Sequence, residues 1–206
     1  MAQKFTEKWP SIVEGSLEEL FAGRQGFLSM KCPGALKDLL GFAGLAGVEH
    51  LPAPRRGIHG VKHLRMVAGL SVKLSVAEGR PPKKPPPIED LWCLWVAGCL
   101  HDLGREDDGK DPGHAERGAG IANRYLHHFH VDAPLASQIV RIIRNHGEDD
   151  ETGFAFIDLV FKDADALERH RLSPWDLDKE RLRTRTARVW SDRVHALYWD
   201  GNPKRS

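Results

Sequence analysis

The stretch 91–105 most constrains the fold, because an apolar run ends there in a His-Asp pair. Leu94 and Gly98 precede His101 by seven and three residues. This spacing predicts a buried helix whose inward stripe continues to His101. Asp102 then places a carboxylate at the end of a buried helix, which is costly unless something pairs with it. A zinc, manganese, iron, cobalt or nickel ion would suit this imidazole and carboxylate, although a capped helix end with a hydrogen-bonded histidine also accounts for the pair.

Composition narrows the class of protein. The chain has 206 residues, enough for one domain with a substantial core, and its 30 Lys and Arg against 29 Asp and Glu give a net charge of +1. A dedicated nucleic-acid binder would usually be more basic, so nucleic acid is not an expected partner. Cys32, Cys93 and Cys99 have no paired spacing, which is typical of a reducing compartment. No apolar run approaches the roughly 20 residues of a membrane span, so we expect a cytoplasmic protein.

Two more histidines continue apolar helical stripes. His63 begins a stripe in a predicted helix over 57–78, and His146 ends one just before Gly147, a helix stop. His114 opens another predicted helix, directly after the polar loop that follows the His-Asp pair. Each histidine alone is compatible with a hydrogen-bonded core residue, but their repetition favours a shared metal site.

A helix predicted over 153–169 carries two candidate aspartates. The segment is apolar nearly all round, so we expect it to be central. Asp163 follows Leu159 by four residues, and Asp165 follows Phe161 by four. Periodicity does not choose between the two.

The loop that follows the pair is polar and holds further candidates. Arg105 is always charged and suits a phosphate or another anion. Asp107, Asp108 or Asp111 would then position a water molecule. The alternative is a solvated acidic loop with no part in the chemistry.

We expect one all-α structural domain in three parts. Residues 1–54 form a helical lead-in packed on the core, residues 55–170 form the core, and residues 171–206 form a C-terminal helical extension. Tryptophans of the extension are expected to be exposed and to serve a homodimer interface. Its arginines are expected to face solvent, namely Arg181, Arg183, Arg185, Arg188 and Arg193.

The ordered set of histidines and aspartates resembles the HD superfamily of metal-dependent phosphohydrolases, which is named for its His-Asp pair. Residues 63–67 match the first histidine motif, residues 101–104 the pair, and residues 162–167 the distal aspartate motif. Residues 114–119 and 145–147 resemble the additional histidine motifs of its two-metal branches. The resemblance covers about residues 55–170 and implies an HD-type helical bundle, and the tail is similar to that of small bacterial members.

The resemblance also implies roles for individual residues. A core metal site would consist of His63, His101, Asp102 and Asp165, the last chosen over Asp163 because the family's aspartate precedes a variable residue and a leucine. His114 and His146 would complete a second site, with Asp102 bridging. The chain departs from two branches of the superfamily. The tyrosine-containing motif of the cyclic-dinucleotide branch is absent, and many single-metal nucleotidases carry a glutamate where this chain has Arg105.

The function that this resemblance implies is hydrolysis of a phosphoester, in a nucleotide or another small phosphorylated molecule. One or two divalent ions (Fe, Mn, Ni, Co, Zn or Mg) would activate a water molecule. Arg105 would clamp the phosphate, and Asp107 or Asp108 would orient water or protonate the leaving group. Two alternatives stay open: an inositol-oxygenase-like protein with two irons, whose pair is followed by Leu-Gly-Lys where this chain has Leu-Gly-Arg, and a non-catalytic ligand-sensing module.

Overall fold

The computed structural model describes residues 58–79, 86–149, 153–173 and 177–199. The predicted lead-in over 1–54 lies outside these residues. The described part of the chain is helical and contains no strand, which confirms the all-α prediction. In chain order the helices are α4 (Val61–Glu78), α5 (Ile88–Leu100), α6 (His114–His128), α7 (Ala133–His146), α8 (Phe156–Glu168) and α9 (Arg185–Trp199). Three short 3₁₀ turns join them, η2 (His101–Gly104), η3 (Arg169–Arg171) and η4 (Lys179–Arg181).

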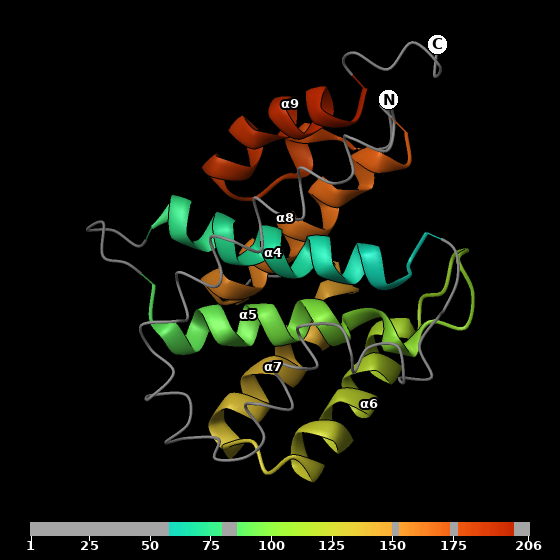
Figure 1. Ribbon diagram of the computed structural model, residues 1–206, viewed down its shortest axis with the longest axis vertical. Helices are drawn as coiled ribbons and strands as arrows, with labels where there is room; N and C mark the ends of the chain where they lie inside the picture. The colour runs from blue at the N-terminus through green and yellow to red at the C-terminus, as the bar shows by residue number, and fades with distance from the viewer. Residues whose placement is uncertain (1–57, 80–85, 150–152, 174–176, 200–206) are drawn as a thin grey trace.

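Helices α4 and α5 lie side by side across the middle of the molecule (Figure 1). Helix α8 packs against α4. Helix α7 packs against both α5 and α6. The largest fully buried side chains come from all of these helices, with Trp92 of α5 and Phe161 of α8 among them. Helix α8 is buried on most sides, and its buried residues include the polar Asp158, Lys162, Asp163 and Glu168.

A glycine lets α4 and α5 approach closely. A Cβ atom added at Gly98 would lie only 2.6 Å from the Cβ atom of Ala68. Ala68 follows His63 by five residues and Gly98 precedes His101 by three. The contact therefore brings two of the predicted ligands toward each other.

Helix α5 ends earlier than the apolar stripe predicts. It stops at Leu100, and the His-Asp pair lies in the 3₁₀ turn η2. Two glycines press this turn onto α6, because a Cβ atom at Gly104 would collide with the backbone of α6 and one at Gly118 would collide with the carbonyl oxygen of His101. This close packing places the start of α6, and so His114, beside the pair.

The C-terminal helix α9 packs on α4 and α8. Arg183 does not face solvent as expected, since its backbone N–H and guanidinium donate to the buried carboxylate of Asp163 at 2.9 and 3.3 Å. Arg181, Arg185, Arg188 and Arg193 are exposed, as expected. Trp190 and Trp199 are half-buried rather than exposed, and the Trp199 indole donates to the carbonyl oxygen of His170 at 2.7 Å.

Among the described helices, none combines the length and the apolar character that crossing a membrane requires.

The packing of α4 on α5 gives a stability prediction. Gly98→Ala is expected to lower the free energy of unfolding by roughly 1–3 kcal/mol, because the added methyl group has no room against Ala68. The control is Gly120→Ala in α6, where an added Cβ meets nothing within 4 Å. This control should raise the free energy of unfolding by about 0.5–1 kcal/mol. Urea denaturation measures both, and equal stabilities for the two variants would contradict the close packing.

Candidate metal centre

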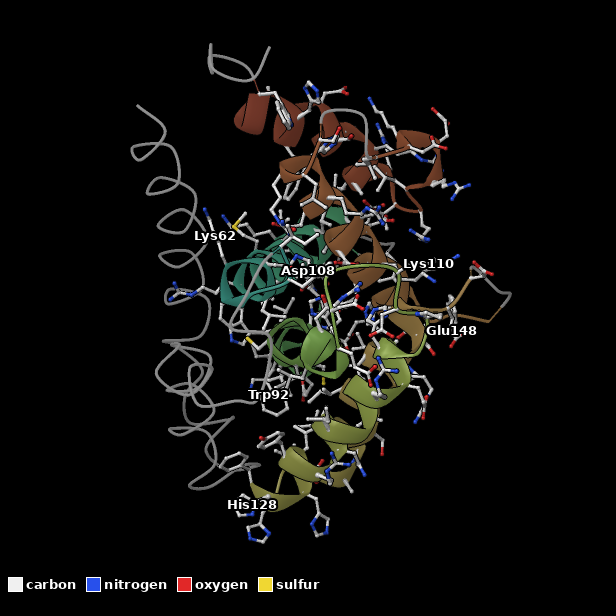
Figure 2. All side chains as sticks on the ribbon, turned by 90° about the vertical axis from the view of Figure 1, so that its right-hand side faces the viewer. Lys62, Trp92, Asp108, Lys110, His128 and Glu148 are labelled. Atoms are coloured by element: carbon white, nitrogen blue, oxygen red, sulfur yellow. The ribbon has the colours of Figure 1, made fainter. Side chains whose placement is uncertain are left out.

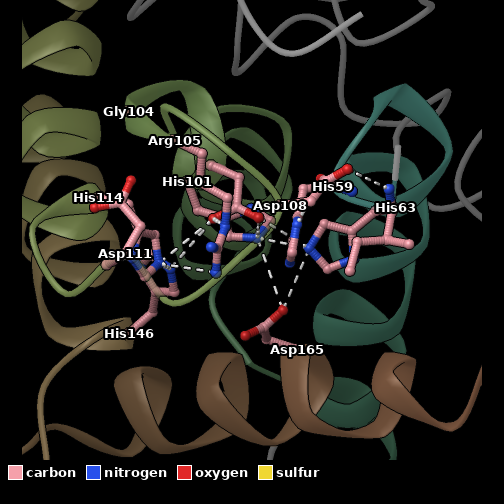
Figure 3. A network of polar contacts seen from close by, with 12 residues as sticks. His59, His63, His101, Gly104, Arg105, Asp108, Asp111, His114, His146 and Asp165 are labelled. Atoms are coloured by element: carbon pink, nitrogen blue, oxygen red, sulfur yellow. Dashed lines mark hydrogen bonds and ion pairs between the residues drawn. The ribbon is translucent and has the colours of Figure 1, made fainter. Parts of the chain in front are cut away.

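The structure brings the six predicted ligands together from five different elements, and Figure 3 labels all of them except Asp102. His63 comes from α4, the His-Asp pair from η2, His114 from the start of α6, His146 from the end of α7 and Asp165 from α8. The side chains of His63, His101 and Asp102 are almost fully buried. The cluster therefore lies where the helices converge.

Asp102 is at the centre of the cluster, and its two carboxylate oxygens face different pairs of histidines. Oδ2 lies 3.3 Å from His63 Nε2 and 3.6 Å from His101 Nε2. Oδ1 lies 3.5 Å from His114 Nε2 and 3.7 Å from His146 Nε2. We name Asp102, His63 and His101 the first trio, and Asp102, His114 and His146 the second trio. In each trio the ligand atoms lie within 4.8 Å of one another.

Asp165 extends the first trio. Its Oδ1 lies 3.4 Å from His63 Nε2 and 3.7 Å from His101 Nε2. Asp163 lies elsewhere, since its carboxylate accepts hydrogen bonds from the backbone N–H groups of Arg183 and Thr184. The two aspartates that periodicity left undecided thus have different contacts, one with the cluster and one with the tail.

The four imidazole rings are held in one orientation by acceptors at Nδ1. His63 Nδ1 lies 2.7 Å from the carboxylate of Glu168. For the other three rings the acceptor is a backbone carbonyl oxygen, that of Gly98 for His101 at 2.9 Å, of Asp111 for His114 at 2.5 Å and of Ile143 for His146 at 2.5 Å. Because these oxygens only accept, each Nδ1 carries a hydrogen, and each ring in its neutral form presents an Nε2 lone pair to the cluster.

These lone pairs need a cation. The Nε2 atoms of His63 and His101 are 3.1 Å apart, and those of His114 and His146 are 3.0 Å apart. Asp102 Oδ1 is buried and has no hydrogen-bond partner. Imidazole nitrogen and carboxylate oxygen are the ligands of zinc, manganese, iron, cobalt and nickel, and a ligating histidine usually donates its other N–H to such an acceptor. The residues present therefore fit divalent metal ions.

Electrostatics prepare the metal-free cluster for a cation. Burial alone would raise the pKa of Asp102, but the neighbouring imidazoles hold that pKa far below its usual range and keep the carboxylate ionised. Burial lowers the pKa of His101 to about 4, so this ring is neutral. Burial opposes the charged form of His63 too, but hydrogen bonds to Asp102 and Glu168 outweigh it and raise the pKa of His63 to about 9. A proton on His63 thus partly takes the place of a metal ion.

Glu168 is a site residue that the sequence interpretation missed. It is fully buried, binds His63 Nδ1 and accepts from Arg171, which also donates to the carbonyl oxygen of Ile58. The spacing contained a signal, because Glu168 follows Asp165 by three residues and so shares its face of α8.

Lys162 also supports the site and was not predicted. The residue is only 6 % exposed, and its ammonium group donates to the carbonyl oxygen of Glu148 at 2.5 Å. This bond secures the end of α7, where His146 lies.

Of the candidate catalytic residues in the loop, Arg105 reaches the cluster. Its Nε lies 3.1 Å from Asp102 Oδ1, and its Nη2 lies 3.5 Å from His114 Nε2. Its Nη1 donates to the carbonyl oxygen of Gly109 at 3.3 Å, within the same loop.

The loop aspartates have other contacts. Asp107 is exposed and accepts from the N–H of Gly109 at 2.7 Å. Asp108 is at the surface (Figure 2) and lies 3.0 Å from Nδ1 of His59, whose ring is 5.4 Å from that of His63. The Asp111 carboxylate pairs with Arg117. The carboxylates of these three aspartates therefore have contacts around the site rather than with the metal ligands, and Asp111 reaches His114 only through its backbone carbonyl oxygen.

Comparison with known proteins agrees with this geometry. A family model described as the HD domain matches residues 60–173, more than half of the chain. The protein therefore belongs to the HD domain family, a superfamily of metal-dependent phosphohydrolases. Neither the curated proteins nor the solved structures contain a significant match.

Glu168 should determine how tightly the first metal ion binds. Glu168→Gln is expected to weaken Zn²⁺ binding by about ten- to a hundredfold, because the His63 ring loses its charged acceptor. Competition with a chromophoric chelator measures the affinity. The control is Glu116→Gln, which removes an exposed carboxylate paired with Arg144. Equal affinities in the two variants would argue against the role of Glu168.

The pKa of His63 predicts proton release on metal binding. Below pH 9 this ring is protonated in the metal-free protein, so the first ion must expel about one proton at pH 7. The release should fall toward zero as the pH passes 9, and the affinity should rise with pH up to that point. Calorimetry of Mn²⁺ binding in buffers of different ionisation enthalpy counts the protons. Proton release that does not change between pH 7 and pH 10 would show that His63 is not the proton carrier.

Proposed function

We propose that this protein is a metal-dependent phosphohydrolase that acts on a phosphoester in a small phosphorylated molecule, such as a nucleotide. The observation that carries the proposal is the position of Asp102 between two pairs of imidazole lone pairs. Two divalent ions bound there would supply an activated water molecule near neutral pH and polarise a phosphoryl oxygen. Membership of the HD domain family supports the same chemistry.

Arg105 is proposed to hold the phosphate. Its guanidinium lies against Asp102 and His114, and its side chain is 14 % exposed. A planar guanidinium binds two oxygens of a phosphate at once and keeps its charge at any working pH. Its position beside the second trio would orient the phosphate toward the ligands.

The remaining loop residues are proposed to act indirectly. The carboxylate of Asp108 contacts the imidazole ring of His59. It also accepts hydrogen bonds from the backbone N–H groups of residues 58 and 59 at 3.3 Å. It therefore links the loop to the segment just before α4, where the ring of His59 lies 5.4 Å from that of His63. Asp107 has no contact that supports a catalytic role, because it is exposed and bonds within its own loop.

A second candidate function is a dinuclear-iron oxygenase of the inositol-oxygenase-like type. It is favoured by the complete set of four histidines and two aspartates, and by a cation, Arg105, that directly follows Leu-Gly after the pair. Two irons bound by this set would use dioxygen as a co-substrate. Oxygen uptake with a polyol or phosphonate, together with a mixed-valent iron signal, would favour this function over hydrolysis.

Substitution of Asp102 tests the leading function. Metal-reconstituted wild-type protein is expected to hydrolyse p-nitrophenyl phosphate or bis(p-nitrophenyl) phosphate. Asp102→Asn is expected to lower both the metal affinity and the turnover rate by more than about a hundredfold. Loss of a group that only hydrogen-bonds to a metal ligand already lowers metal affinity or activity about ten- to a hundredfold, and Asp102 is itself a proposed ligand. The control is Asp192→Asn, an exposed residue of α9 that pairs with Lys179.

The outcomes separate the candidate functions. Full activity in Asp102→Asn would contradict the site. A wild-type protein that binds metal but neither hydrolyses phosphoesters nor consumes oxygen would favour the ligand-sensing module.

A further inference from the structure

The two trios differ in the charges around them. Near the first trio, Asp165 adds a carboxylate oxygen 3.4 Å from His63 Nε2, and Glu168 adds another behind the same ring at 2.7 Å from Nδ1. At the second trio, the acceptor behind each ring is a neutral carbonyl oxygen. The first trio is therefore the stronger site for a cation, since carboxylates contribute full negative charges and carbonyls only partial ones.

The second trio already has a cation beside it. Arg105 lies 3.1 Å from Asp102 Oδ1 and 3.5 Å from His114 Nε2, which are two of the three ligand atoms of that trio. These are the same electron pairs that a metal ion would use. The arrangement is not a well-satisfied ion pair, because Arg105 Nε and Asp102 Oδ1 are both buried without an aligned hydrogen bond.

Arg105 is able to leave this position. It belongs to the loop between η2 and α6, where residues 106–110 are exposed. Its contact with that loop is one bond from Nη1 to the carbonyl oxygen of Gly109, at 3.3 Å. A phosphate offers the guanidinium two aligned, charged acceptors, which the second trio does not.

We propose that Arg105 is a resident cation of the second trio that competes with the metal ion there, and that a bound phosphate draws it away. The first ion then binds tightly and the second weakly until phosphate is present. Because coupling between two ligands is reciprocal, the second ion and the phosphate strengthen each other's binding. The withdrawal of Arg105 by phosphate rests on the proposed function, whereas the competition between Arg105 and the metal ion does not.

Mn²⁺ titration of the full, chelator-stripped chain by calorimetry tests the competition. In wild type, one ion should bind tightly and a second weakly. Arg105→Gln is expected to tighten the second ion by about tenfold or more, because a unit positive charge leaves the ligands, and to leave the first unchanged. Arg105→Lys keeps the charge and should stay closer to wild type.

The matched control removes a different positive charge near the same trio. Arg144 of α7 pairs with Glu116 of α6 and lies two residues before His146, so Arg144→Gln should bind Mn²⁺ as wild type does. Thermal unfolding of the metal-free variants verifies that each is folded. If Arg105→Gln does not fold, Mn²⁺ titration of Arg105→Lys with and without phosphate still tests the proposal. Phosphate must then draw the lysine cation away from the second trio and raise the affinity for the second ion.

The same titrations are repeated with inorganic phosphate present. Phosphate should raise the affinity for the second Mn²⁺ in wild type and have little effect on this affinity in Arg105→Gln. A second-ion affinity in Arg105→Gln that is within about twofold of wild type, or weaker, would overturn the competition. Arg105→Gln could raise the affinity for the second Mn²⁺ while phosphate leaves that affinity unchanged in wild type. The competition then stands, but the withdrawal of Arg105 by phosphate is overturned together with the proposed substrate class.

Discussion

Asp102 is a residue only 1 % exposed, and its carboxylate is surrounded by four imidazole rings from four elements. A buried carboxylate is tolerated only when charges or hydrogen bonds compensate for the loss of water. Here the compensating groups come from parts of the chain that are far apart in sequence, namely α4, η2, α6 and α7. The convergence of these elements and the charge state of the centre therefore depend on one another. Metal ions between these groups would join the same elements more strongly than the hydrogen bonds of the metal-free cluster do.

Close helix packing makes this convergence possible. Gly98 lets α5 lie against Ala68 of α4, and Gly104 and Gly118 let the 3₁₀ turn lie against α6. A side chain at any of these positions would push one histidine away from the others. Outer contacts then orient the rings, through Glu168 for His63 and through backbone carbonyl oxygens for the remaining three. The geometry of the centre is thus set mainly by the packed helices, and among these acceptors only the carbonyl oxygen of Asp111 belongs to the loop between η2 and α6.

Helical periodicity was enough to predict the all-α fold and the inward direction of three histidines, because a buried stripe repeats at a fixed spacing. It did not separate Asp163 from Asp165, since α8 is surrounded by protein and both faces have a partner. The end of α5 before His101 was not predicted either, because contacts with α6 determine where that turn begins. Glu168 was missed although its spacing from Asp165 placed it on the same face. The contacts of Asp107 and Asp108 were beyond sequence reasoning, since they depend on the path of a loop.

The most direct test of a centre organised by Asp102 is anomalous diffraction from crystals of the full chain grown with excess Mn²⁺ and inorganic phosphate. Two manganese peaks are expected, on opposite sides of the Asp102 carboxylate. One should contact Oδ2, His63 and His101, and the other Oδ1, His114 and His146. Manganese peaks that do not touch Asp102, or none within the cluster, would contradict this organisation of the centre.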